Sequence, residues 1–300
     1  MTSTDASDIP ADRKVRRPRG GTSFAFLPVP SLLLVIFGLC LPLLLMARYS
    51  FAEFDPRDMA IQGLTLENYA KFFTDPFYRD VLLRTVGVAA LTTLLCLILG
   101  VPAAHLISRT KSARLRTILI LASIIPLLMG NAVRVAGWMV LLSDRGLVNE
   151  SLLFLGLIDE PIRIMYTLSA VLLSLVAVLL PFMIITLQSV FDRVSADYED
   201  AAATMGAKPA TAFFRIFVPL AMPGIYSGGL LVFILGMNAY ASPVLLGGPT
   251  FHMMAPAVYE QAIEAFNWPF AASLAFVLMV ATLILTVASS LFLQKRYGRM

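Results

Sequence analysis

Six long apolar stretches constrain this chain more than any other feature of its sequence. Each is close to or longer than the roughly 20 residues that a helix needs to cross about 30 Å of hydrocarbon. None alternates apolar and polar residues as the strand of a membrane barrel would, so each is expected to be a helix. The sequence therefore predicts an all-α integral membrane protein with six transmembrane helices. The expected spans are approximately 27–46, 81–107, 117–142, 167–190, 225–246 and 270–293.

Composition excludes the other broad classes of protein. The chain is 58% hydrophobic and only 14% charged, too few polar side chains to cover a soluble domain of this length. Cys40 and Cys96 both lie in apolar runs, where a thiol behaves as a small hydrophobe. No expected span carries a cluster of His, Asp or Glu. We therefore expect neither catalytic residues nor a metal site, and no cofactor bound by this chain.

Basic residues indicate the orientation in the membrane. Lys and Arg occur in the N-terminal tail, in the 109–116 and 191–224 connections and after residue 293. Cytoplasmic loops carry an excess of Lys and Arg, so both termini are placed in the cytoplasm. The first stretch is treated as a retained helix because no small-residue cleavage site follows it. The expected organisation is a basic cytoplasmic tail (1–26), a transmembrane domain (27–293) and a cytoplasmic C-terminal tail (294–300).

The cytoplasmic connection at about 195–220 predicts two short helices. Acidic residues and the candidate cap Ser195 precede an alanine run of high helix propensity. Gly206 suits a left-handed turn, Pro209 suits the start of the second helix, and Pro219 is expected to end it. A compact helix pair of this kind is suited to transmitting a push from another protein. Its expected apolar anchors are Tyr198, Met205, Phe213 and Phe214.

This connection resembles the cytoplasmic signature of the permease subunits of type I ATP-binding-cassette (ABC) importers. The signature reads Glu-Ala-Ala, three residues, Gly, nine residues and Ile-x-Leu-Pro, and the same spacing occurs here from Asp200 to Pro219. Asp200 replaces the usual Glu, although Glu199 is adjacent, and Val218 replaces Leu. The resemblance implies a coupling helix that sits in a groove on an ATPase subunit. The residues expected to couple to the ATPase are Glu199, Asp200, Ala201, Ala202, Met205, Gly206, Ile216 and Pro219.

Further segments look like the spermidine/putrescine branch of that family: 133–139, 146–149, 239–249 and 267–270. The resemblance implies the type I importer transmembrane fold in a bacterial-type inner membrane. It also implies import of a small polar solute, polyamine-like or another small nitrogenous compound, by alternating access. The implied partners are two copies of an ATPase subunit that binds ATP and Mg, a second, paralogous permease and a periplasmic solute-binding protein. No nucleic acid is expected as a partner.

Polar residues in the expected third span suggest a solute pathway, since such residues are costly in lipid. Asn131, Arg134 and Trp138 are spaced i, i+3 and i+7 and share one helix face. The alternative for Arg134 is a side chain that snorkels to water. The alternative for Asn131 is a hydrogen bond between helices.

The expected fifth span offers Asn238 and Tyr240 as further pathway residues. These two lie about 200° apart on an ideal helix, so both can line one route only if the backbone loosens. Gly236 and Pro243 on either side would permit this. A packing contact between helices is the alternative for Asn238.

Two connections on the outer side are too long to be simple turns. Residues 51–80 contain a short amphipathic pattern that predicts a surface helix, and 247–269 contains apolar residues at helical spacing. Both are candidates for docking or gating surfaces or, equally, for structural caps on the helix ends.

The residue types that are absent from the sequence bear on the charge of the solute and on the source of energy. No expected span contains a carboxylate for a dication, and Arg134 would repel one. The chain also lacks a Gly-rich phosphate loop ending in Lys-Ser/Thr, so ATP would have to be used by a partner. A self-contained ion-coupled carrier is the alternative function, although it predicts acidic residues within the membrane and internal repeats.

Overall fold

The computed structural model describes residues 29–55 and 60–297, and the chain divides into two units, 1–46 and 47–300. Helix α1 (Val29–Ser50) begins in the first unit. Its segment Pro30–Ser50 is apolar and long enough to cross a membrane, which confirms the first expected span. The predicted basic tail, 1–26, lies outside the described residues.

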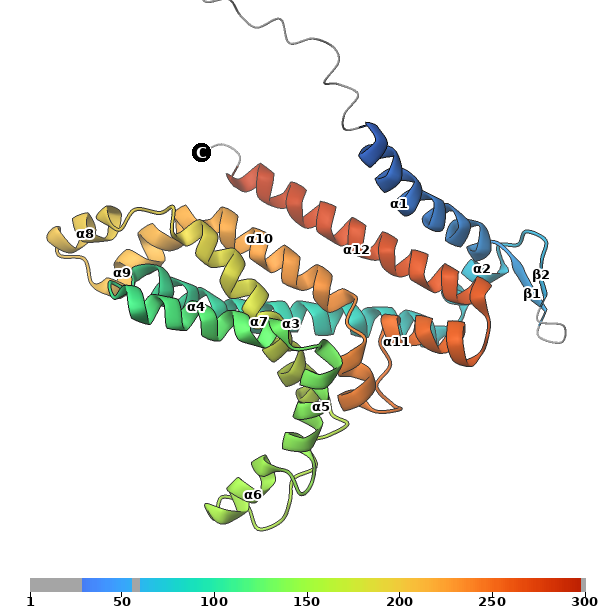
Figure 1. The fold of residues 1–300 in the computed structure, drawn as a ribbon, viewed down its shortest axis with the longest axis horizontal. Helices are drawn as coiled ribbons and strands as arrows, with labels where there is room; N and C mark the ends of the chain where they lie inside the picture. Colours follow the sequence, from blue (N-terminus) through green and yellow to red (C-terminus); the bar gives the residue numbers. More distant parts are fainter. Residues whose placement is uncertain (1–28, 56–59, 298–300) are drawn as a thin grey trace, which may run out of the picture. The chain divides into compact units, whose positions relative to one another are not determined.

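The second unit is almost entirely helical, with one small β-hairpin near its start (Figure 1). Its long helices are α3 (Pro76–Arg109), α4 (Ala113–Leu128), α5 (Asn131–Leu142), α7 (Leu168–Phe191), α10 (Val218–Met237) and α12 (Trp268–Tyr297). The shorter elements are β1 (Glu53–Asp55), β2 (Ala60–Gln62), α2 (Glu67–Thr74), α6 (Leu147–Phe154), α8 (Asp197–Thr204), α9 (Pro209–Ala212) and α11 (Met254–Tyr259). In the part of the chain that the structure describes, three π-helical segments complete the set: η2 (Phe213–Phe217), η3 (Pro243–Gly247) and η4 (Glu260–Glu264).

The predicted fold class is confirmed. Among the described residues, five helical segments are long and apolar enough to cross a membrane, and a bent pair of helices supplies a sixth if the pair forms one span. The five segments are Pro30–Ser50, Pro76–Arg109, Leu168–Phe191, Pro209–Met237 and Trp268–Leu291.

Helices α3, α7 and α10 pack against one another and form the centre of the unit. Glycine lets these helices approach closely. A Cβ on Gly100 would lie 2.7 Å from Cγ of Met183, and one on Gly224 would lie 2.6 Å from Cβ of Val190. Small residues at such crossings allow close van der Waals packing. This packing matters in membranes because the hydrophobic effect contributes little to the association of helices there.

The third expected span is not one continuous helix. Helix α4 ends at Leu128, and the helical segment from Asn131 to Phe154 is bent by 98° from it. Pro126 lacks an N–H in the last turn of α4, and Gly130 leaves the helical conformation, with ψ 138°, before α5. Both residues favour a break.

The fifth expected span is displaced toward the N-terminus. Helical structure is continuous from Pro209 to Met237, whereas the sequence pattern predicted 225–246. The predicted helix end at Pro219 is therefore wrong, because the chain passes through this residue into α10. The cytoplasmic helix pair and the fifth span thus share one continuous helical segment.

The predicted surface helix in 51–80 is confirmed as α2. Phe72 is buried in a second apolar cluster with Phe270 and Met254, from α12 and α11. Asn68 Nδ2 donates hydrogen bonds to the carbonyl oxygens of Ser50 (3.1 Å) and Ala52 (2.8 Å). At the other end of the unit, α12 continues to Tyr297, beyond the predicted boundary at residue 293.

Candidate functional site

The turn between α8 and α9 is held by a glycine in the left-handed conformation. Gly206 has φ +84°, and its N–H donates to the Ala203 carbonyl at 2.9 Å. The Ala207 N–H donates to the Ala202 carbonyl at 3.0 Å. These two bonds form the Schellman ending of a helix, as Gly206 predicted. Pro209 occupies the first turn of α9, also as predicted.

Ser195 caps the first turn from a position one residue earlier than the N-cap. Ala196 occupies the N-cap, while Ser195 Oγ accepts the Asp197 N–H at 3.2 Å and donates to Asp197 Oδ2 at 2.8 Å. The acidic first turn of α8 is thus ordered by a local hydrogen-bonded loop.

A π-helical turn joins α9 to α10. The Val218 N–H donates to the Phe213 carbonyl, five residues back. This wider turn accommodates Pro219, which has no N–H and whose ring would clash with a carbonyl in a regular α-helix. The helix pair therefore continues into one of the three central helices without a loop.

The exposed surface of the helix pair carries three of the four predicted anchors. Met205 is 81% exposed, Phe214 67% and Tyr198 55%. Phe213 is different, because it is half-buried and stacks on Phe217 with 5.7 Å between ring centroids. It therefore contributes less to the exposed face than the other three predicted anchors, since its ring also belongs to the aromatic packing beneath the pair.

The predicted coupling residues divide between the exposed face and the interior. Ala202 is buried, and Glu199 turns inward. Arg109 Nε donates to Glu199 Oε2 at 2.5 Å, and His105 Nε2 lies 3.6 Å from Glu199 Oε1. The exposed members are Asp200, Ala201, Met205, Gly206 and Pro219, and Ile216 is half-buried.

A cavity of about 450 Å³ lies between α5, α7 and the chain after α10. Asn131, Arg134, Asn238 and Tyr240 all line it. Trp138 does not line it, because it packs one turn further along α5 against the hydrophobic core. The structure thus brings together four of the five predicted pathway residues.

Both fifth-helix residues reach this cavity because α10 ends at Met237. Asn238 and Tyr240 lie in the short non-helical segment before η3, so the predicted loosening between Gly236 and Pro243 is confirmed. Ser242, in the helical turn that follows this segment, is buried with its Oγ 3.0 Å from Ser174 Oγ of α7. That contact fixes the position of the segment beside the cavity.

The guanidinium of Arg134 is held by one backbone carbonyl at the break before α5 and one in α7. Its Nη2 donates to the Met129 carbonyl at 3.0 Å and its Nη1 to the Val178 carbonyl at 3.5 Å. The side chain thus folds over the break and keeps its positive charge at the wall of the cavity.

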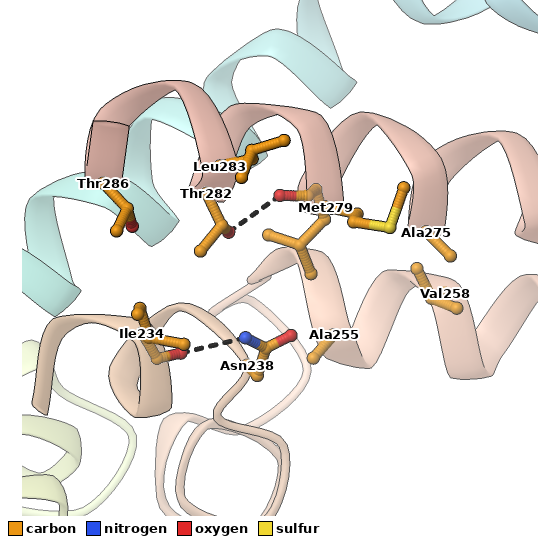
Figure 2. A pocket seen from close by; sticks show the side chains of 10 residues that line it. Ile234, Asn238, Ala255, Val258, Ala275, Met279, Thr282, Leu283 and Thr286 are labelled. Atoms are coloured by element: carbon orange, nitrogen blue, oxygen red, sulfur yellow. Dashed lines mark hydrogen bonds between the residues drawn. The ribbon is translucent and has the colours of Figure 1, made fainter. Parts of the chain in front are cut away.

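Asn238 also borders an apolar pocket between α10, α11 and α12, shown in Figure 2. Its Nδ2 donates to the Ile234 carbonyl at 2.9 Å, and Thr282 Oγ1 donates to the Leu278 carbonyl at 2.8 Å. These polar groups bond to their own helices. The pocket wall is otherwise mainly aliphatic, which makes it unsuited to hold a charged solute.

A further cavity of about 530 Å³ lies on the other side of Tyr240, and sequence reasoning missed it. Its walls include Tyr166, Tyr240 and Tyr259, and Glu260 and Glu264 contribute carboxylates. The rings of Tyr240 and Tyr259 have centroids 5.0 Å apart. We call the cavity lined by these five residues the tyrosine–glutamate cavity. Its only sequence signal was a pair of acidic residues in a connection regarded as a docking or gating surface.

Backbone geometry places Tyr166 in that cavity. Tyr166 has φ +64°, which is rare for a bulky residue, and its N–H donates to the Leu246 carbonyl at 2.9 Å. Its ring fills the space where Gly248 has no side chain, since a Cβ there would lie 2.4 Å from Tyr166 Cδ1. Among the described residues, no group of three or more His, Cys, Asp or Glu could hold a metal ion.

The amino-acid sequence matches one family model and several known proteins. A family model described as "binding-protein-dependent transport system inner membrane component" covers residues 96–297. The spermidine/putrescine transport system permease protein PotB of Escherichia coli (strain K12) is 36% identical over 247 residues, covering 82% of this chain and 89% of that protein. The inner membrane ABC transporter permease protein YdcU of Escherichia coli (strain K12) is 32% identical over 279 residues, covering 88% and 85% respectively.

Solved structures show the same fold at much lower identity. One chain of a bacterial alginate ABC transporter, in complex with an alginate pentasaccharide-bound periplasmic protein, matches with a TM-score of 0.75 and 15% identity. That match covers 91% of this chain and 94% of the other. One chain of the MetNI methionine ABC transporter matches with a TM-score of 0.55. From the family match and the relatives, this chain belongs to the binding-protein-dependent transport system inner membrane components, the permease subunits of type I ABC importers.

Proposed function

We propose that this permease subunit imports a polyamine-like cation, or another small nitrogenous solute, into the cytoplasm by alternating access. The observation that carries the proposal is the similarity to PotB over most of both chains. A relative that also spans most of the chain, YdcU, is named only as a permease, so the solute is assigned from PotB and from the chemistry of the cavities.

The tyrosine–glutamate cavity supports a cationic solute. The spans expected from sequence held no carboxylate, whereas Glu260 and Glu264 of η4, directly after α11, supply two. Helix α11 lies near the end of α10 distant from α8 (Figure 1). Aromatic faces attract ammonium groups, with about 0.5–2 kcal/mol per contact. Tyr166, Tyr240 and Tyr259 stand beside those carboxylates. Together they form a surface that favours ammonium groups over anions.

The positive charge of Arg134 would make binding of a cationic solute weak rather than tight further along the route. Its positive charge lies at the wall of the cavity on the other side of Tyr240. A cation that enters from the tyrosine–glutamate cavity would be repelled there and would not remain bound. Affinity for the solute would then reside mainly in the periplasmic solute-binding protein.

The exposed face of α8 and α9 supports docking of an ATPase subunit. Met205, Phe214 and Tyr198 present apolar side chains beside the short Ala201 surface. Because Pro209–Met237 is long enough to cross a membrane, α8 and α11 lie at opposite ends of that span. With α8 in the cytoplasm, the tyrosine–glutamate cavity faces the solute-binding protein.

The proposed assembly contains two copies of the ATPase subunit, which use ATP and Mg, and a second, paralogous permease beside this chain. It would reside in the inner membrane with both termini of this chain in the cytoplasm. The coupling residues would be those of the α8–α10 junction, and the pathway residues would be Asn131, Arg134, Asn238 and Tyr240. Trp138 would support the core behind this route rather than meet the solute.

Uptake into proteoliposomes tests this proposal. The chain is reconstituted with its ATPase subunit, second permease and binding protein, and uptake of labelled spermidine and putrescine is measured with and without ATP. Molybdate serves as an anionic comparison. ATP-dependent uptake of the polyamines is expected. Uptake of the anion alone would refute the cationic assignment, and polyamine uptake without any ATPase subunit would favour the ion-coupled carrier.

A further inference from the structure

The carboxylate of Glu199 connects the cytoplasmic helix pair to the end of α3. Arg109 is the last residue of α3, and its Nε lies 2.5 Å from Glu199 Oε2 in α8. Both side chains are largely buried, with 21% of Arg109 and 19% of Glu199 exposed. His105, one helical turn earlier in α3, lies 3.6 Å from the other carboxylate oxygen. Within the described residues, these are the only ion pairs that α8 makes.

This ion pair rests on an aromatic cluster at the π-helical turn. The Arg109 guanidinium carbon lies 5.0 Å from the centroid of Phe217, a fully buried residue of η2. The His105 ring lies 4.4 Å from Phe217 and 4.8 Å from Phe213, centroid to centroid. Three elements, α3, α8 and η2, therefore meet at one charged and aromatic contact. In such a partly desolvated place, charges interact more strongly than at the surface.

The direction of the Glu199 side chain separates it from its neighbours in the signature. Asp200, Ala201 and Met205 are exposed on α8, while Glu199 points toward α3. A carboxylate that is committed to an internal pair is not offered to a docking protein. Its effect must therefore pass through α3, where Arg109 is its ion-pair partner and His105 lies beside it.

We infer that Glu199 is a positioning residue that makes α8 move together with α3, and that it does not contact the ATPase. This inference rests on the proposed docking of an ATPase subunit at α8. A displacement of α8 would then reach the central helices by two routes. One route is the continuous helix through η2 into α10, and the other is the Glu199–Arg109 pair into α3.

The chain offers a matched control pair. Arg116 Nη2 lies 2.6 Å from Asp192 Oδ2 and joins the start of α4 to the end of α7. These side chains are 40% and 34% exposed, so water and salt weaken their interaction. Neither residue belongs to α8, and the pair should contribute little to coupling.

The test uses the assembled transporter in proteoliposomes, with spermidine as the probe solute. The variants are Glu199→Gln, Arg109→Gln, the charge exchange Arg109→Glu with Glu199→Arg, and Asp192→Asn as the control. Three quantities are measured: the ATPase subunit that copurifies, the rate of ATP hydrolysis, and the solute molecules imported per ATP hydrolysed. Only the last reports coupling rather than assembly.

Each single variant at the internal pair is expected to retain the ATPase subunit and to lower import per ATP by about tenfold. The charge exchange should restore most of the loss, and Asp192→Asn should leave the ratio unchanged. Release of the ATPase by Glu199→Gln but not by Arg109→Gln would overturn the inference, because Glu199 would then act at the docking surface. Failure of the charge exchange in a complex that assembles normally would also overturn it.

Three further variants complete the test: two for the positioning role and one for the proposed docking. If the neutral variants do not insert, Arg109→Lys and Glu199→Asp change the geometry while keeping both charges. An unchanged import ratio in both would count against the positioning role. Met205→Glu tests docking itself. If it leaves the ATPase subunit bound, the proposed docking at α8 fails whatever the behaviour of Glu199.

Discussion

The two ends of α10 differ in construction, and the difference bears on the proposed coupling and on the proposed contact with solute. At its start, α10 continues from α9 through a π-helical turn and is braced by the Glu199–Arg109 pair. At its end, the helix stops at Met237 and an irregular segment borders two cavities. A continuous helix transmits displacement, whereas an irregular segment can present neighbouring residues to the same route. The first end suits coupling and the second suits contact with a solute.

The largest effect should come from disrupting the turn at the coupling end. Gly206→Val places a β-branched residue at φ +84°, where left-handed backbone costs about 1–2 kcal/mol even for an ordinary residue. We expect solute uptake and solute-stimulated ATP hydrolysis to fall about 50-fold while insertion into the membrane is retained.

Two controls accompany this variant. Gly206→Asn should restore much of the activity, because Asn tolerates the left-handed conformation. Gly87→Val should have little effect, since Gly87 is helical and a Cβ added to it would meet nothing within 4 Å. Normal transport by Gly206→Val would show that the turn does not matter for coupling.

At the solute end, neutralising the tyrosine–glutamate cavity should weaken uptake of a cation. The double variant Glu260→Gln with Glu264→Gln is expected to raise KM for spermidine about tenfold, and each single variant about threefold. The difference from wild type should shrink at high salt, since both carboxylates are exposed. Initial uptake rates over a range of spermidine concentrations measure this.

Glu67→Gln is the matched control, because Glu67 is an exposed acidic residue of α2 outside the lining of this cavity. An equal rise in KM in that variant would mean that general surface charge, and not the cavity, attracts the cation.

A smaller effect is expected when the two residues of the irregular segment are shortened separately. Tyr240→Ala removes a wall of both cavities and should lower uptake about fivefold, while Asn238→Ala should lower it about twofold. Tyr240→Phe keeps the ring and should stay close to wild type. Uptake is measured together with recovery of the assembled complex. Loss of assembly in either alanine variant would favour the packing role for that residue.

The smallest effect should be on stability. Ser242→Ala removes the buried hydroxyl contact with Ser174, and a typical hydrogen bond between membrane helices contributes about 0.6–1 kcal/mol. Thermal unfolding in detergent should show a Tm lower by a few degrees, with transport retained. Ser169→Ala provides the comparison, because Ser169 is exposed and lies in α7, the helix that carries Ser174. An unchanged Tm for Ser242→Ala would show that the contact does not hold the irregular segment.

Features that depend on a few neighbouring residues were predictable. The apolar stretches indicated the helices, Gly206 indicated its own backbone conformation, and Pro209 indicated the start of α9. The surface helix α2 was likewise indicated by its local amphipathic pattern. In each case the cause lies within one or two turns of the chain, where propensity and periodicity act.

Features that depend on remote partners were not predictable. The inward turn of Glu199 needs Arg109, and the burial of Phe213 needs His105, both from α3. Neither contact has a signal in the local pattern. Pro219 was expected to stop a helix because a regular α-helix cannot accommodate it, but the π-helical turn removes that conflict.

The amino-acid sequence alone established the membrane as solvent, the approximate places of the apolar helices, and the left-handed turn at Gly206. These follow from hydropathy and from the backbone limits of glycine and proline. Only packing in three dimensions decided which polar residues share a cavity, where the third span bends, and which carboxylate of α8 faces inward. Such choices depend on packing between α3, α7 and α10, and the energies of those contacts belong to pairs of residues that are far apart in the chain.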